Sequence, residues 1–294
     1  MKPIWLLGKA IFDEDMDSIK SAITEQGMKW IEVGYVMGDL YVDRGGEGIE
    51  LERYIHNYGL WDTPLFMYGS LQMVKACNKH CPTVQTYCNL EQFKCSYYYP
   101  RFGNWLLQQD YIMIPYGEIE RRKEFLFDAV GENDCIFVRP DDGFKTFTGQ
   151  VLCKDAWKRD KGSLDSYELV PSETICIVAR PINIQREWRL IVGGEDCEQK
   201  VVAGSQYKVN DRLKELREVP ERVLTAAETV LHSVDYHPDP FWTLDLCEAY
   251  GEIHVLETGS LSCAGWYKAD SAEIVRAVSD YIDREWEILN ALMV

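Results

Sequence analysis

The chain has 294 residues, of which 46% are hydrophobic, and a formal net charge of −17. This length and apolar content predict one large core or two to three smaller lobes, and they exclude wholesale disorder. Such a negative charge repels phosphate backbones and anionic lipid headgroups, which argues against nucleic-acid and membrane partners. The sequence shows neither a signal-like N-terminus nor an apolar run long enough to cross a bilayer, so we expect a cytoplasmic protein.

Four of the ten cysteines form a local cluster that also contains His80, namely Cys77, Cys81, Cys88 and Cys95. Three, six and six residues separate them, unlike the paired two-residue spacing of zinc knuckles. We therefore expect free, buried or half-buried thiols and keep a zinc site as the alternative. Cysteines in apolar, strand-like runs behave as small hydrophobes, and this describes Cys135, Cys176, Cys247 and Cys263.

The first third of the chain reads as one α/β lobe, which we assign to residues 1–98. Hydrophobic periods predict a strand at 3–8, a helix at 13–26 and a strand at 30–35, the pattern of a parallel βα unit. An acidic, glycine-rich interruption follows at 39–48. The pattern then resumes with a strand, a helix and a short strand, at 64–67, 70–79 and 83–87.

A second domain is expected over residues 99–172. An aromatic stretch begins it, and we expect Tyr97, Tyr98 and Tyr99 to be exposed. A strand at 111–115 and a helix at 119–128 follow. Two strand-like runs, 135–139 and 148–153, would then form a hairpin around a loop that contains two aspartates and a glycine.

The third expected domain covers residues 173–294. Short β-branched runs predict antiparallel strands at 174–178, 187–192 and 200–203. A charged helical segment is expected at 211–234, with Pro220 as a point of interruption. A last strand pair and a closing helix follow, at 241–246, 253–257 and 271–293.

Two carboxylates end the last pair of predicted strands, Asp245 after Trp242-Thr243-Leu244 and Glu257 after His254-Val255-Leu256. Neighbouring strands would bring them together. Magnesium takes oxygen ligands and needs only one or two carboxylates when waters and phosphates complete its octahedron. The alternative is a pair of solvated charges at strand ends.

Three cations belong to this region: Arg139 follows an apolar run, Lys145 follows the loop after it, and Arg189 lies inside the run 187–192. A charge that closes or interrupts a buried strand is costly unless it is paired. Each cation could pair with a nearby carboxylate, as Arg189 could with Glu187. Taken together with the two carboxylates, the three cations are what a triphosphate and its metal require.

The two commonest nucleotide fingerprints are absent, since the sequence has neither GxxxxGK[ST] nor GxGxxG after the first strand. The loop 141–144 is a candidate phosphate-covering flap, because glycine lets backbone amides approach phosphate oxygens closely. The small residues Gly259, Ser260 and Gly265 form either a substrate loop or a simple turn.

The order of these parts resembles the ATP-grasp superfamily, in particular the subgroup with arginine in place of the first nucleotide-binding lysine. The motifs that carry the resemblance run in this order: Phe137-Val138-Arg139-Pro140-Asp141, Lys145-Thr146-Phe147-Thr148-Gly149, Glu187-Trp188-Arg189-Leu190, Trp242-Thr243-Leu244-Asp245, Val255-Leu256-Glu257 and Ala264-Gly265-Trp266-Tyr267. The resemblance covers nearly the whole chain. It implies an α/β (α+β) fold in which an N-terminal pre-ATP-grasp domain precedes two α+β lobes built on antiparallel sheets.

The resemblance also implies roles for individual residues. Arg139 and Lys145 would hold the nucleotide phosphates, and Arg189 would face the γ-phosphate. The backbone of the interlobe segment 177–180 would contact adenine. Val178, Ala179 and Arg180 are therefore expected to be nucleotide-binding residues. Asp245 and Glu257 would hold magnesium.

One position departs from the family pattern. Gly259 stands where the family usually has a metal-binding asparagine. Either Ser260 or water would then supply the missing oxygen, or metal binding is weakened.

The implied activity is that of a ligase, which uses ATP and Mg2+ to phosphorylate a small-molecule or peptide carboxylate and couples it to an amine or similar nucleophile. A catalytically degenerate module that binds a nucleotide or a protein is the first alternative. An unrelated α/β enzyme that uses the cysteine cluster is the second.

Overall fold

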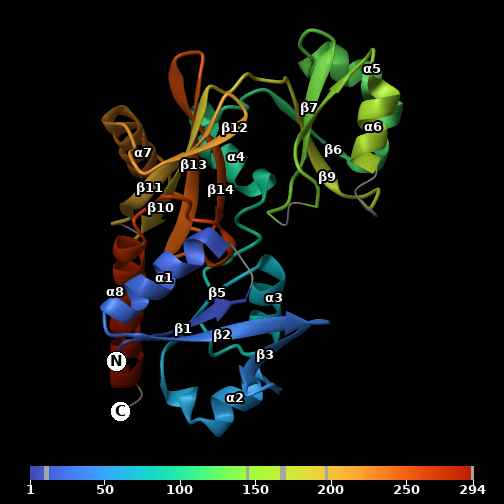
Figure 1. Cartoon of the computed structure of the whole chain (residues 1–294). Coiled ribbons are helices and arrows are strands. Elements are labelled where there is room, and N and C mark those ends of the chain that lie inside the picture. The colour runs from blue at the N-terminus through green and yellow to red at the C-terminus, as the bar shows by residue number, and fades with distance from the viewer. Residues whose placement is uncertain (10–12, 144–145, 166–169, 196–197, 293–294) are drawn as a thin grey trace.

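The computed structural model describes residues 1–9, 13–143, 146–165, 170–195 and 198–292, and these form three lobes (Figure 1). The N-terminal lobe is built on a sheet of order β4-β3-β2-β1-β5. The small lobe has the order β6-β9-β7-β8, and the large lobe has β12-β11-β10-β13-β14. The expected fold class, an α/β lobe followed by two lobes with antiparallel sheets, is confirmed.

In the N-terminal lobe, β1 lies between two parallel neighbours, β2 and β5, so the predicted parallel βα unit is present. The strands of the lobe are β1 (Ile4–Gly8), β2 (Lys29–Val36), β3 (Asp39–Arg44), β4 (Glu47–Glu50) and β5 (Leu65–Tyr68). Its helices are α1 (Asp13–Glu25), α2 (Leu51–Asn57), α3 (Leu71–His80) and the short 3-10 turn η1 (Leu60–Asp62).

Two predictions for this lobe need correction. The stretch 39–48 is not an interruption, because β3 and β4 form a hairpin that extends the sheet beyond β2. Its turns use residues with positive φ, among them Met37 and Gly45, which hydrophobic periodicity does not reveal. The short strand expected at 83–87 is reduced to an isolated bridge between Phe66 and Gln85.

The small lobe contains the predicted hairpin, formed by β7 and β8. Its elements are β6 (Tyr111–Pro115), η3 (Tyr116–Glu118), α5 (Ile119–Val130), β7 (Cys135–Pro140), β8 (Gln150–Cys153), α6 (Trp157–Asp165) and β9 (Ile175–Ala179). Strand β9 pairs with both β6 and β7 and therefore belongs to this sheet. A boundary at residue 172 would separate β9 from its partners.

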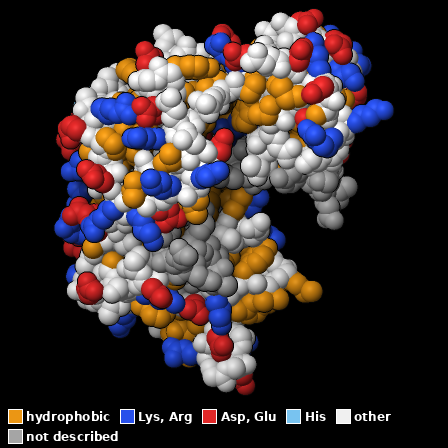
Figure 2. All heavy atoms as spheres, turned by 45° about the horizontal axis from the view of Figure 1, so that its top comes forward, with side chains coloured by type: hydrophobic (Ala, Val, Ile, Leu, Met, Phe, Trp, Pro, Cys, Tyr) orange, Lys and Arg blue, Asp and Glu red, His pale blue; other side chains and the backbone are white. Residues whose placement is uncertain are grey.

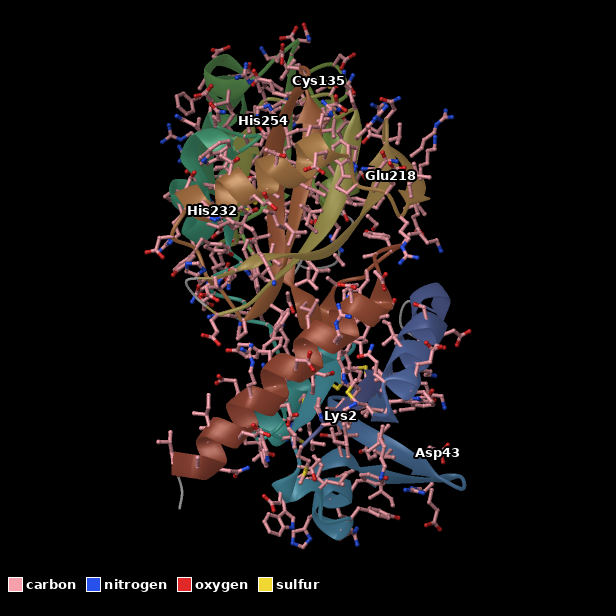
Figure 3. All side chains as sticks on the ribbon, turned by 90° about the vertical axis from the view of Figure 1, so that its left-hand side faces the viewer. Lys2, Asp43, Cys135, Glu218, His232 and His254 are labelled. Atoms are coloured by element: carbon pink, nitrogen blue, oxygen red, sulfur yellow. A yellow bond between two sulfur atoms is a disulfide. The ribbon has the colours of Figure 1, made fainter. Side chains whose placement is uncertain are left out.

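The expectation that Cys135 behaves as a small hydrophobe is wrong, because this residue forms a disulfide. Cys135 and Cys153 are register partners across the β7–β8 hairpin and form a disulfide. Cross-strand partners bring their Cβ atoms within the range a disulfide needs, but a one-dimensional pattern does not state the register. Figure 3 places Cys135 at the end of the molecule away from Lys2 and Asp43 in the N-terminal lobe.

The clustered four form no disulfide, and they divide between two cores. Cys77, Cys81 and Cys88 lie in the core of the N-terminal lobe, whereas Cys95 packs in the core of the large lobe. Burial raises the pKa of Cys81 to about 11. These thiols therefore act as buried apolar groups rather than as reactive thiolates.

The large lobe carries the longest antiparallel strands. They are β10 (Arg186–Gly193), β11 (Lys200–Val209), β12 (Arg212–Leu216), β13 (Phe241–Ala249) and β14 (Glu252–Ser260). The helices are α7 (Glu221–Ser233), α8 (Ser271–Leu292) and the 3-10 turn η4 (Leu261–Cys263).

The helix expected at 211–234 is wrong in its first part. Asn210 and Asp211 both have positive φ, 46° and 60°, which is the conformation of a two-residue hairpin turn. This turn pairs Val209 with Arg212 and folds 212–216 back as β12. The helix begins only after Pro220, which caps it.

The aromatic stretch forms α4 (Cys95–Phe102), followed by the 3-10 turn η2 (Gly103–Trp105). The expectation that it is exposed is wrong, since Tyr98 and Tyr99 are only 1% and 2% exposed and pack in the core of the large lobe. Their aromatic area stabilises the junction between lobes through burial. The segment after α4 leads from the large lobe into the small one (Figure 1).

A shared core joins the N-terminal and large lobes. Helix α8 packs along α1, and Trp5 and Phe66 from one lobe meet Phe241 and Trp266 from the other. Figure 2 shows the molecule indented between the small lobe and the N-terminal lobe. Within the residues that the structure describes, no helix is both long and apolar enough to cross a bilayer.

Candidate functional site

A cavity of about 450 Å³ lies between the small and large lobes, within the size range of small-molecule sites. The small lobe contributes Phe137 and Arg139, and the large lobe contributes Arg189 and Glu257. The segment that connects β9 to β10 adds Pro181, Ile182 and Ile184. The cavity therefore contains part of the site that the sequence predicts.

The two predicted carboxylates do come together. Asp245 and Glu257 are register partners on β13 and β14, so their side chains share one face of the sheet. A β-bulge follows directly, because Asp245 pairs with Glu257 while Leu246 pairs with Val255. The extra residue is Leu256, and both Leu256 and Glu257 line the cavity.

Arg189 is buried against Asp245. Strand register places the two residues opposite one another on β10 and β13. The guanidinium donates from Nε to Oδ1 at 2.8 Å and from Nη2 to Oδ2 at 2.7 Å, and Nη1 donates to the carbonyl of Gly265 at 3.2 Å. Burial acts to lower the pKa of Arg189, but the Asp245 carboxylate outweighs it and raises the pKa well above its usual value.

Two stacked tyrosines lie beside this ion pair. Tyr207 and Tyr267 stack with ring centroids 4.8 Å apart, and the Arg189 guanidinium lies 5.6 Å and 5.2 Å from the two centroids. The Tyr207 hydroxyl donates to Glu187 at 2.6 Å. Glu187 pairs in turn with Lys208 at 3.2 Å, so it is not the partner of Arg189.

Arg139 reaches across from the small lobe. It lies near the end of β7, and its Nη2 donates to Oε2 of Glu257 at 3.1 Å. The other oxygen of Glu257 is 3.8 Å from Nη2 of Arg189. Glu257 is therefore held between two guanidinium groups from different lobes, which concentrates positive charge on the cavity wall.

The remaining predicted nucleotide residues differ in where they lie. Lys145 falls outside the described residues. Val178 and Ala179 are fully buried at the end of β9, and Arg180 is exposed beside Asp110. The cavity wall is formed by the residues that follow them, 181–184, rather than by these three side chains.

Gly259 and Ser260 follow Glu257 on β14, at the point where the sequence lacks the usual asparagine. Gly259 pairs with Thr243, and a Cβ at Gly259 would lie 2.8 Å from the Thr243 hydroxyl oxygen, so a larger residue would require that threonine to move. Ser260 lies on the opposite face of β14, and its hydroxyl donates to the Tyr87 carbonyl at 2.6 Å. Ser260 therefore does not supply an oxygen beside Glu257.

The donor set can be tested against a magnesium ion. Carboxylate oxygens are the hard ligands that Mg2+ prefers, and one or two suffice when phosphates and waters complete the octahedron. Glu257 lines the cavity, whereas Asp245 is 0% exposed and its oxygens accept hydrogen bonds from Arg189. No group of three or more His, Cys, Asp or Glu suited to a metal occurs in the described part of the chain. Glu257 therefore has the chemistry of a ligand to a metal held jointly with phosphates, whereas both oxygens of Asp245 are already engaged by Arg189.

Several residues of the cavity lie outside every sequence motif. Gln108 lines it from the segment between α4 and β6, which carries no motif. Tyr207 and Lys208 lie on β11, beyond the end of the strand expected at 200–203. A longer apolar alternation would have signalled that strand, but Ser205, Gln206 and Lys208 interrupt it.

Comparison with solved structures supports the three-lobed fold. D-cycloserine synthetase DcsG aligns with a TM-score of 0.63 at 14% identity, covering 95% of this chain and 99% of that one. The VanG D-Ala:D-Ser ligase of Enterococcus faecalis aligns with a TM-score of 0.58 at 12% identity, covering 96% and 97%. The ATP-grasp ligase PsnB, solved with a minimal precursor, gives 0.52 at 11% identity, covering 95% and 98%. At such identities the likeness concerns the fold.

Comparison of the sequence with protein-family models identifies the family. Among curated proteins none gives a significant match to this chain. Residues 120–277, more than half of the chain, match the family model described as "ATP-grasp domain, R2K clade family 2". That segment contains Arg139, Arg189, Asp245 and Glu257. The chain therefore belongs to the ATP-grasp superfamily, in R2K clade family 2.

Proposed function

We propose that this protein is an ATP-dependent ligase that phosphorylates a carboxylate and couples the acyl phosphate to an amine or similar nucleophile. The observation that carries the proposal is the convergence of Arg139 and Arg189, from two different lobes, on Glu257 in the wall of the interlobe cavity. Family membership supports ATP as the phosphoryl donor. The structural relatives are named as a synthetase and two ligases, which supports bond formation as the outcome.

The cations would bind and orient the phosphates. Arg139 and Lys145 hold the nucleotide phosphates, and Arg189 faces the γ-phosphate and then the acyl phosphate. Arg189 is fixed by Asp245, Gly265 and the two tyrosine rings, so its charge is already in place before substrate binds. Such preorganised charge is the main protein contribution to phosphoryl transfer.

Glu257 and Asp245 would hold Mg2+, with Glu257 as the ligand on the cavity wall and Asp245 behind it. When bound, the ion supplies charge neutralisation between the transferred phosphoryl group and the leaving ADP. Arg139 competes with the ion for Glu257, so phosphate oxygens that draw the Arg139 guanidinium away would favour metal binding. Nucleotide and metal are therefore expected to bind cooperatively.

The chemistry proceeds in two balanced steps. A carboxylate oxygen attacks the γ-phosphorus, an O–P bond forms, and the bond to the β-phosphate oxygen breaks to release ADP. The amine then attacks the acyl carbon, a C–N bond forms, inorganic phosphate leaves and the amine loses a proton. Neither step requires a nucleophilic side chain of the protein.

The test is ADP release with a panel of amino-acid and short-peptide carboxylates, each with and without amine acceptors. We expect ADP formation that depends on the carboxylate, on the acceptor and on Mg2+, and its loss in Glu257→Gln. Glu252→Gln is the matched control, because Glu252 is exposed at the start of the same strand. ADP release that is unaffected by Glu257→Gln would contradict the assignment.

A second candidate is a non-catalytic nucleotide-binding module. It is favoured by Gly259 and by the engagement of the Asp245 oxygens with Arg189. This candidate predicts nucleotide binding that is the same with and without Mg2+, and no ADP release with any member of the panel.

A further inference from the structure

The segment just before the small lobe is held against strand β14 of the large lobe. Leu106 forms a parallel bridge with Val255 of β14, and the Leu107 amide donates to the Val255 carbonyl at 2.9 Å. The next residue, Gln108, is 8% exposed and lines the interlobe cavity. Its backbone is thus held in place before any ligand binds.

The side-chain amide of Gln108 is only half satisfied. Its Nε2 donates to the carbonyl of Arg180 at 3.2 Å. A carbonyl can only accept, so this bond fixes which end of the amide is nitrogen. The other end, Oε1, has no hydrogen-bond partner among the residues that the structure describes. A buried acceptor without a donor is costly and calls for an explanation.

Gln108 shares the cavity wall with several apolar side chains. Leu107, Cys247 and Ala249 form a small cluster with Ile182, Ile184 and Leu256. Cys247 lies two residues beyond Asp245 on β13, so this cluster is displaced from the charged pair by roughly 7 Å along the strand. The cavity therefore has charged groups in one part and apolar walls with a single amide in another.

Such a division suits a flat heterocycle joined to phosphates. The unpartnered Oε1 lacks a hydrogen-bond donor, and adenine carries one as its 6-amino group. We propose, on the basis of the function proposed above, that Gln108 accepts a hydrogen bond from the 6-amino group of adenine and thereby selects ATP. A nucleotide with a carbonyl at position 6, such as GTP or ITP, would place an acceptor against an acceptor.

The experiment measures the Kd values of ATP, ITP and purine riboside triphosphate, which lacks any 6-substituent, in the presence of Mg2+. Wild-type protein should bind ATP about 5- to 150-fold more tightly than the unsubstituted analogue, which is the equivalent of about 1–3 kcal/mol for one buried hydrogen bond. ITP should bind no better than the unsubstituted analogue. In Gln108→Met the preference for ATP should fall to less than about threefold, since Met fills similar space without an acceptor.

The matched control is Gln109→Met. Gln109 is exposed, and its amide donates to the Asn104 carbonyl, so this variant should keep the wild-type preference. Equal affinity of the wild type for all three triphosphates overturns the role of Gln108, and so does a Gln108→Met variant that keeps the full preference. The wild-type comparison needs no variant, so a folding defect cannot hide the answer. If the wild type binds none of the three, the proposed function falls as well.

Discussion

Replacement of Asp245 by asparagine should destabilise the protein strongly, because it leaves the Arg189 charge buried without its main partner. Asp245 is 0% exposed and accepts two hydrogen bonds from the guanidinium, at 2.8 Å and 2.7 Å. Removal of one member of a buried ion pair costs about 3–5 kcal/mol. Glu257, 3.8 Å from the same guanidinium, offsets part of this, so we expect the lower end of the range.

The assay is thermal unfolding of the ligand-free protein. A loss of about 3 kcal/mol corresponds to a Tm decrease of roughly 6–12 °C, at about 2–4 °C per kcal/mol for domains of about 150–250 residues. Asp211→Asn is the matched control, since Asp211 is an exposed partner of Lys208 at 3.3 Å and should change stability by less than about 1 kcal/mol. Urea unfolding of both variants gives the same comparison at 25 °C.

The double variant Arg189→Met with Asp245→Leu refines this prediction. It removes both charges, and buried ion pairs replaced by apolar residues of similar volume are often neutral in stability. The double variant should therefore recover much of the stability lost in Asp245→Asn. An Asp245→Asn variant as stable as Asp211→Asn would refute the view that this pair is a buried, mutually dependent unit.

Three further predictions concern other parts of the chain. Burial raises the pKa of Asp239 from 3.8 to about 7, so the folded state loses stability as pH rises from about 4 to about 7. In Tm measurements, Asp239→Asn should therefore be more stable than the wild type above pH 7 and equally stable at pH 4. Reduction of Cys135–Cys153, which closes a loop with a sequence separation of 18, should destabilise the small lobe by about 3 kcal/mol, and Cys135→Ser should no longer respond to reductant in the same melt. Ser260→Ala removes a hydrogen bond to the Tyr87 carbonyl and should lower the free energy of unfolding in urea by about 1 kcal/mol. The Mg2+ dependence of nucleotide binding should not change, and a change would indicate that Ser260 does contribute to the metal site.

The sequence allowed the fold to be predicted where hydrophobic periods were long and uninterrupted. The βα unit of the N-terminal lobe, the β7–β8 hairpin and the β13–β14 pair all followed from such runs. The pairing of Asp245 with Glu257 followed in turn, because both carboxylates end apolar runs that had to be neighbours. The turn at Asn210 and Asp211 was missed, because two charged or polar residues in a charged segment are equally consistent with helix.

The details of the site could not be derived in the same way, because they depend on strand register. Whether Arg189 pairs with Glu187 or with Asp245 is decided by which residue lies opposite on β13, and no local pattern states this. The disulfide has the same origin, since Cys135 and Cys153 become neighbours only through register. Gln108 lies in an irregular segment, and its half-satisfied amide is visible only in three dimensions.

The most direct test of the proposed function is thermal unfolding of the wild-type protein with a non-hydrolysable ATP analogue, with and without Mg2+. A ligand that binds only the native state at about 100 times its Kd adds about 2.7 kcal/mol of stability. We predict a rise in Tm with nucleotide that grows when Mg2+ is added, and a loss of that Mg2+-dependent increment in Glu257→Gln. The absence of any rise at about 1 mM nucleotide, where even a Kd near 10 µM would give the full effect, would contradict the proposal that the interlobe cavity is a nucleotide site.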